Sequence, residues 1–226
     1  VSAAVEVAAD TDFRMVRQAG PHSAVACWRL GLGGGSSRRS RRRSSRASDP
    51  LYQCAVLQAN EEGHLVRGPH VTLGTGEYKI GLEATESYAV ACRNHQNLAT
   101  YCTAFSLNGT SLTATGEFTL HQGDTGERHV MSAGGARFVL CFGTKRAGVN
   151  CAALDAKAAT LGQSKYLGPL ETSSQISMPH LVFKREDGGA TIALFWDYRT
   201  STSLVVMNLD GAGGTELSVQ PRRELT

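Results

Sequence analysis

Six cysteines restrict the fold of this chain more than any other feature of its sequence. Cys92 and Cys102 are ten residues apart, and so are Cys141 and Cys151. In both pairs an apolar run ends at the first cysteine, and a polar, turn-rich stretch separates it from the second. Two strands joined by a short loop would place each pair directly opposite, at the distance that a disulfide requires. The spacing therefore predicts two disulfide-bridged hairpins.

Two further units follow the same frame. Cys27 and Cys54 have similar flanks but lie 27 residues apart, and the excess is a Gly-, Ser- and Arg-rich insertion over residues 31–50. In the last unit Leu194 and Leu204 take the two cysteine positions, again ten apart, which predicts an apolar pair in place of the disulfide. A strand-like segment is centred twelve residues before the first cysteine position of each unit, at Met15, Ile80, His129 and Val182.

Each unit holds four strand-like segments, and the units follow one another at intervals of 48 residues (65 less the 17-residue excess of the insertion), 49 and 53. This period is typical of β-propeller blades, because one small twisted sheet cannot bury both faces unless neighbours pack against it. We predict an all-β chain of four four-stranded antiparallel blades, as a closed four-bladed propeller or as part of a larger one. A β-sandwich with a chance repeat is the alternative. The predicted blades cover residues 10–30 with 51–74, then 75–122, 123–172 and 173–226, and residues 1–9 are predicted to form an extra outer strand.

In its general pattern the chain resembles β-propeller proteins with short blades, such as the hemopexin-like domain and the tachylectin-type lectins. The resemblance covers nearly the whole chain outside residues 31–50, and it is a resemblance of architecture. The sequence shows no WD dipeptide signature repeated from unit to unit, no kelch double-glycine motif followed by spaced aromatics, and no calcium loop of integrin-type propellers. The resemblance therefore implies a fold, and it implies no binding residues.

Pairing of Cys27 with Cys54, and of the cysteines within each hairpin, leaves no free thiol. Because disulfides persist in oxidising compartments, we expect a secreted, extracellular or luminal protein. The alternative is a reduced cytosolic protein with six buried cysteines. Asn108-Gly109-Thr110 is a glycosylation sequon and also a favoured turn sequence. No apolar run reaches the roughly 18 residues that a membrane-spanning helix needs.

The insertion is predicted to be a disordered loop, and it carries a cluster of arginines: Arg38, Arg39, Arg41, Arg42, Arg43 and Arg46. It could bind a polyanion, be cut by a dibasic-type protease at Arg39-Ser40-Arg41-Arg42, be phosphorylated at Ser44 or Ser45, or be a tolerated insertion at a loop tip. The formal net charge of +3 falls to −3 without these six arginines. The predicted folded part is therefore mildly acidic, and we expect no nucleic-acid partner.

No catalytic constellation stands out. The seven histidines show neither HxH nor HExxH spacing, and no nucleophile elbow, P-loop or dinucleotide fingerprint follows a strand. We therefore predict a non-enzyme with no catalytic residue, no metal ligand and no cofactor. Carboxylates precede the first strand of three units, at Asp12, Glu77 and Glu127, where they could bind a cation or a sugar hydroxyl, or simply solvate a turn.

The main functional hypothesis is a non-catalytic protein-interaction or structural module, whose partners are other proteins or copies of itself that meet exposed strand edges. The alternative is a carbohydrate-binding, lectin-like propeller with glycans as partners. Its aromatic surface would come from Trp28 and Trp196, which follow their cysteine positions by one and two residues. A propeller enzyme is a third possibility, but no catalytic constellation in the sequence supports it.

Overall fold

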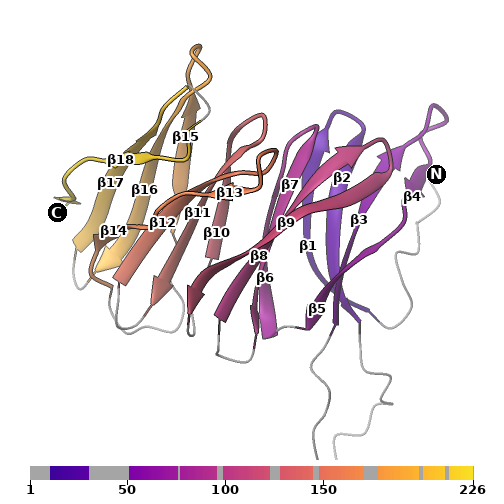
Figure 1. The fold of residues 1–226 in the computed structure, drawn as a ribbon, viewed down its shortest axis with the longest axis horizontal. Helices are drawn as coiled ribbons and strands as arrows, with labels where there is room; N and C mark the ends of the chain where they lie inside the picture. Colours follow the sequence, from indigo (N-terminus) through magenta and orange to yellow (C-terminus); the bar gives the residue numbers. More distant parts are fainter. Residues whose placement is uncertain are drawn as a thin grey trace, which may run out of the picture.

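The computed structural model shows four antiparallel β-sheets that lie side by side in a row (Figure 1). The structure describes residues 11–30, 51–75, 77–95, 99–122, 128–144, 148–170, 178–198, 201–211 and 214–225. These residues form strands and turns, and no helix occurs among them. The all-β prediction with four blade-like sheets is confirmed.

The sheets follow one another along the chain. The first contains β1 (Thr11–Gly20), β2 (Ser23–Leu30), β3 (Leu51–Ala59), β4 (Leu65–Arg67) and β5 (Val71–Thr75). The second contains β6 (Glu77–Ala84), β7 (Tyr88–His95), β8 (Ala99–Asn108) and β9 (Ser111–Gln122). The third contains β10 (Arg128–Gly134), β11 (Arg137–Thr144), β12 (Gly148–Asp155), β13 (Thr160–Leu161) and β14 (Lys165–Gly168). The fourth contains β15 (His180–Lys184), β16 (Ala190–Tyr198), β17 (Ser201–Leu209), β18 (Leu217–Val219) and β19 (Arg223–Leu225).

Three sheets have five strands because the predicted outermost strand is split into two short ones. In the first and third sheets a glycine marks the split. A Cβ on Gly68 would lie 1.8 Å from the carbonyl oxygen of Thr110, and one on Gly162 would lie 2.1 Å from that of Thr215. Both threonines belong to the following sheet. The backbone of that sheet therefore approaches the break so closely that only glycine fits there.

Consecutive sheets pack face to face, with inner strand β1 beside β6, β6 beside β10 and β10 beside β15. Apolar layers fill the three spaces between them, around Phe105, Phe138 and Trp196 respectively. Stacked sheets whose inner strands are adjacent are the arrangement of β-propeller blades. The first and fourth sheets lie at opposite ends of the row, so the array has two end faces (Figure 1). We call the face of a sheet turned toward the next sheet its forward face, and the opposite one its backward face.

The three predicted disulfides are present: Cys27–Cys54, Cys92–Cys102 and Cys141–Cys151. Each joins residues that lie directly opposite on the second and third strands of a sheet, with Cα atoms 4.0–4.1 Å apart. Each pair also belongs to the apolar layer shared with the following sheet. All three disulfides therefore lie on forward faces.

The predicted equivalence of Leu194 and Leu204 in the fourth sheet is wrong. Leu194 pairs with Val205, whereas Leu204 pairs with Phe195. The reason is the hairpin loop: two residues separate β16 from β17, but three separate β7 from β8 and β11 from β12. The shorter loop moves the pairing by one residue. Phe195 and Leu204, on the forward face, thus occupy the disulfide position.

Each sheet begins with a strand that contains the predicted residue: Met15, Ile80, His129 or Val182. Two of these residues lie directly opposite the first cysteine of their sheet. Met15 lies opposite Cys27, and His129 lies opposite Cys141. In the second sheet an irregularity between Glu77 and Ile80 places Gly81 opposite Cys92. In the fourth sheet Val182 lies opposite Ile192, because five residues rather than two separate its first two strands.

The residue directly after the first cysteine position packs backward onto the outermost strand of the preceding sheet. A Cβ on Gly74 would lie 3.1 Å from the guanidinium of Arg93, and one on Gly168 would lie 3.0 Å from the ring of Trp196. Phe142 packs on His121 with ring centroids 5.3 Å apart. With the corrected register, these three residues and Trp28 all hold the same position in their sheets.

Candidate functional site

A cavity of about 420 Å³ lies between the third and fourth sheets, at the ends of their inner hairpins. Residues of the third sheet line one side: Ala133, Gly134, Gly135, Ala136, Arg137 and Asp155. Residues of the fourth sheet line the other: Lys184, Arg185, Gly188 and Gly189. We call this cavity the inter-sheet pocket. It lies between two neighbouring blades of the array.

Arg137 is only 8% exposed and forms the buried wall of the pocket. It begins β11, directly opposite Asp155 on β12. Its guanidinium Nη1 donates a hydrogen bond to the carbonyl oxygen of Asp210, so it links the third sheet to the fourth. Gly188, at a φ of +78°, leaves room beside Nη2: a Cβ there would lie 3.7 Å away. The guanidinium is thus fixed in place by the packing of the two sheets.

The carboxylates beside the pocket already accept hydrogen bonds from the protein. Asp155 Oδ1 accepts from the backbone N–H groups of Lys157 and Ala158, at 2.8 and 2.9 Å. Asp187 accepts from the backbone N–H of Gly189 at 2.8 Å and from the Arg185 guanidinium. The Gly189 hydrogen bond lowers the pKa of Asp187, and the charge of Arg185 acts in the same direction. Three cationic side chains thus line a pocket that has one carboxylate in its wall.

A second hollow of about 850 Å³ adjoins the inter-sheet pocket, since Gly135 and Lys184 line both. All four sheets contribute to it, through the β1–β2 and β6–β7 turns, β10 and β15. Thr85 Oγ1 donates to the carbonyl oxygen of Gly135 at 2.9 Å, and Arg17 Nε lies 3.6 Å from Glu83 Oε2. These contacts join the inner strands of neighbouring sheets along a polar surface.

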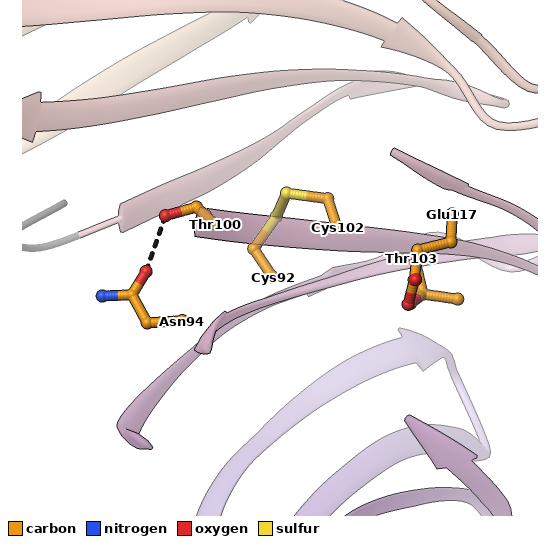
Figure 2. The surroundings of a disulfide bond; sticks show 6 residues. All are labelled: Cys92, Asn94, Thr100, Cys102, Thr103 and Glu117. Atoms are coloured by element: carbon orange, nitrogen blue, oxygen red, sulfur yellow. Dashed lines mark hydrogen bonds between the residues drawn. A yellow bond between two sulfur atoms is a disulfide. The ribbon is translucent and has the colours of Figure 1, made fainter. Parts of the chain in front are cut away.

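A third polar cluster lies between the first and second sheets. The Nη2 atom of Arg93 is 3.0 Å from Glu117 Oε2, and its guanidinium lies over the ring of Tyr101 at 5.3 Å from the centroid. Thr103 Oγ1 also reaches Glu117 Oε2, at 3.4 Å. Figure 2 shows Thr103 and Glu117 close to the Cys92–Cys102 disulfide. Arg93 is 7% exposed and its guanidinium lies against Gly74 of the first sheet, so this cluster is part of the packing between the sheets rather than an open site.

The two tryptophans do not form a sugar-stacking surface. Trp28 and Trp196 are each 1% exposed. The indole N–H of Trp196 donates to the carbonyl oxygen of Pro169 at 3.1 Å, across the space between the third and fourth sheets. Among the described residues, the indole N–H of Trp28 has no hydrogen-bond acceptor. Both rings are core residues, which corrects the role that the lectin hypothesis gave them.

The other predicted site residues have varied positions. Asn108 is exposed at the end of β8, where Gly109 at a φ of +56° and Thr110 turn the chain into β9. The arginine cluster of residues 31–50 and Glu127 lie outside the described residues, as do the side chains of Asp12 and Glu77.

No sequence motif marks the cationic side chains that line the pocket. Arg137 and Lys184 belong to different repeats and meet only when the third and fourth sheets pack.

Within the described residues, no three His, Cys, Asp or Glu side chains lie close enough to hold a metal ion. A search of the same residues finds no helix with the length and apolar character needed to cross a membrane.

No protein-family model and no curated protein matches the chain, but solved structures do. The SapL1 lectin, solved with α-methyl fucoside, is 14% identical with a TM-score of 0.54, and the match covers 95% of this chain and 65% of the lectin chain. The Aleuria aurantia lectin, described as a six-bladed β-propeller that recognises fucose, is 14% identical with a TM-score of 0.40, covering 96% and 79%. An apocarotenoid oxygenase from Synechocystis is 10% identical with a TM-score of 0.44, covering 92% and 49%. The chain thus spans 65% of the SapL1 lectin, and that likeness, with the four stacked sheets, defines a β-propeller fold.

Proposed function

We propose that this protein is a non-catalytic, carbohydrate-binding β-propeller and that the inter-sheet pocket is its saccharide site. The observation that supports this most directly is the lining of the pocket. A guanidinium and an ammonium group can donate to sugar oxygens, the Asp155 carboxylate can accept from a hydroxyl, and glycine-rich turns let a ligand approach the backbone. The fold shared with the SapL1 lectin is consistent with such a site.

The charges of the pocket favour a saccharide that carries an acidic group. Arg137, Lys184 and Arg185 supply three positive charges, against the carboxylate of Asp155 in the wall and that of Asp187 beside it, which Arg185 engages, so one positive charge remains in excess. Hydrogen bonds between a cationic donor and a carboxylate or sulfate are roughly twice as strong as neutral ones, and Arg is suited to bidentate contact. We therefore propose uronic-acid or sulfated saccharides as the ligand class, rather than neutral ones.

Calorimetric titration with matched neutral, carboxylated and sulfated oligosaccharides tests the proposal. We expect the acidic ligands to bind and the double variant Lys184→Gln/Arg185→Gln to weaken binding at least about tenfold, since charged hydrogen bonds contribute about 1.5–3 kcal/mol each. The control Lys165→Gln/Arg223→Gln removes the same charge from positions outside the pocket and should bind like the wild type. A folded protein that binds none of these saccharides, or a double variant that binds normally, would refute the pocket assignment.

We further propose that the protein works in an extracellular or luminal compartment, which its three disulfides favour. An interaction module remains the second candidate function. The observation in its favour is an uncovered apolar sheet face at one end of the array, where Leu181 and Phe183 are 54% and 57% exposed.

A further inference from the structure

The forward face of the fourth sheet carries the apolar side chains that a further sheet would cover. Leu181 on β15 lies opposite Ala193, as Met131 on β10 lies opposite Val139. Met131 is 1% exposed because the fourth sheet covers it, but the equivalent Leu181 is 54% exposed. The difference comes from the neighbour and not from the position within the sheet.

This face has the composition of an interface. Its apolar centre consists of Leu181, Phe183, Ala193, Phe195, Leu204 and Val206. Two polar pairs bracket it along the central hairpin: Thr191 Oγ1 bonds Asn208 Oδ1 at 2.8 Å, and Thr202 Oγ1 bonds Asp197 Oδ1 at 3.0 Å. An apolar centre with a polar rim is the usual anatomy of a protein–protein contact. We call this surface the end face.

The opposite end of the array is not free to receive the end face. On the backward face of the first sheet, Ala26 and Ala55 are 0% exposed and Trp28 is 1% exposed. A second copy that docked head to tail would meet a surface that is already buried. Two copies can therefore cover their apolar end faces only by bringing them against each other.

We propose that two copies of this chain pack their fourth sheets face to face about a two-fold axis. An axis parallel to the strands and above β16 would place β15 of one copy over β17 of the other, with Leu181 level with Val206 and Phe183 level with Asn208. Such an isologous contact closes on itself and leaves no further end face exposed.

The size of the end face sets the expected strength of the contact. The strand β15 has 5 residues, β16 and β17 have 9 each, and β18 and β19 have 3 each. At about 4.8 Å spacing and about 3.3 Å rise, these strands cover roughly 460 Å² per copy. Two copies would bury about 900 Å², which is in the range of weak, transient complexes. The dimer should therefore form reversibly, in the micromolar range.

Sedimentation equilibrium of the whole chain from about 1 to 200 μM tests this proposal. We expect the average mass to rise with concentration from 24.1 kDa toward twice that value. The double variant Leu181→Glu/Phe183→Glu should remain at the monomer mass, and it should fold normally because both side chains are exposed. Leu65→Glu is the matched control, because Leu65 is 46% exposed on β4 at the other end of the array, and it should dimerise like the wild type.

Four results would overturn the proposal. The wild-type chain could stay monomeric throughout, or it could assemble beyond the dimer, which would indicate head-to-tail growth. The Leu181→Glu/Phe183→Glu variant could still dimerise. Finally, equal loss of dimer in Leu65→Glu would place the contact elsewhere.

Discussion

Phe195 and Leu204 lie directly opposite each other on β16 and β17, in the position that a disulfide occupies in the other three sheets. A fourth disulfide should therefore form in Phe195→Cys/Leu204→Cys. By the chain-entropy estimate it would stabilise the protein by about 2–3 kcal/mol relative to its reduced form. Thiol titration and unfolding with and without reductant measure both effects.

The control for this prediction is Leu194→Cys/Leu204→Cys, the pair that has the same ten-residue spacing as the cysteines of the second and third sheets. Leu194 packs in the layer shared with the third sheet, on the face opposite to that of Leu204. We expect it to keep two free thiols. A disulfide in the control, and none in the first variant, would show that the register of the fourth sheet is different.

The same side-chain hydrogen bond occurs in the second and fourth sheets, and its contribution to the free energy of unfolding should depend on whether a neighbouring sheet buries it. Thr100 Oγ1 donates to Asn94 Oδ1 at 2.6 Å, two residues beyond the Cys92–Cys102 disulfide on each strand (Figure 2), and Thr100 is 0% exposed. Thr202 makes the equivalent bond in the fourth sheet, where no sheet covers it. Thr100→Val should cost about 1–2 kcal/mol of unfolding free energy, and Thr202→Val under about 0.5. Urea unfolding of dilute monomer compares them, and equal costs would contradict the uncovered end face.

The two equivalent tryptophans should respond differently to the same substitution. Trp196→Phe removes both ring volume and the hydrogen bond to the Pro169 carbonyl oxygen. Trp28→Phe removes ring volume but no such bond to a described residue. We expect Trp196→Phe to cost about 1 kcal/mol more, the usual net value of one hydrogen bond. Thermal and urea unfolding report the difference, and a larger cost for Trp28→Phe would argue against the equivalence of the two positions.

Acid should remove a stabilising effect of Asp187. Its folded-state pKa lies below the ordinary value of 3.8, chiefly because of the Gly189 hydrogen bond. The unfolded chain therefore binds this proton first, so the stabilisation is complete above about pH 4 and disappears as the pH falls through the folded-state pKa. The Tm of the wild type should exceed that of Asp187→Asn at pH 6, and the gap should close toward pH 2. A gap that is constant with pH would exclude ionisation as its cause.

Glycosylation at Asn108 is a prediction that mass spectrometry can check. The residue is exposed at a hairpin end, so its side chain is accessible to modification. In a secretory eukaryotic host the chain should gain one glycan that Asn108→Gln lacks. An unmodified Asn108 in a secreted product would show that the sequon serves only as a turn.

The number of sheets and the disulfide pairs could be predicted because cross-strand cysteines fix a register by themselves. Cys92 and Cys102 specify both the partner residue and the shared face, whatever surrounds them. The fourth sheet offers no such marker. Leu194, Phe195 and Trp196 are consecutive and all apolar, because the strand has apolar side chains on both faces. The sequence pattern is therefore the same whether the loop has two residues or three.

The inter-sheet pocket could not be predicted for a different reason. Arg137 begins a strand of one repeat and Lys184 ends a strand of the next, and neither stands in a motif. Their proximity depends on how two sheets stack. Trp28 and Trp196 show the opposite case. Their side chains would suit a sugar-binding surface, but sheet packing buries them.

The most direct test of the account is to locate the saccharide on the protein. A titration of isotopically labelled protein with a sulfated or uronic-acid oligosaccharide, followed by amide chemical shifts, can do so. The account predicts saturable shifts centred on the turns that line the inter-sheet pocket, at Gly134, Gly135, Gly188 and Gly189. Shifts centred elsewhere, or a spectrum that no acidic saccharide changes, would contradict it.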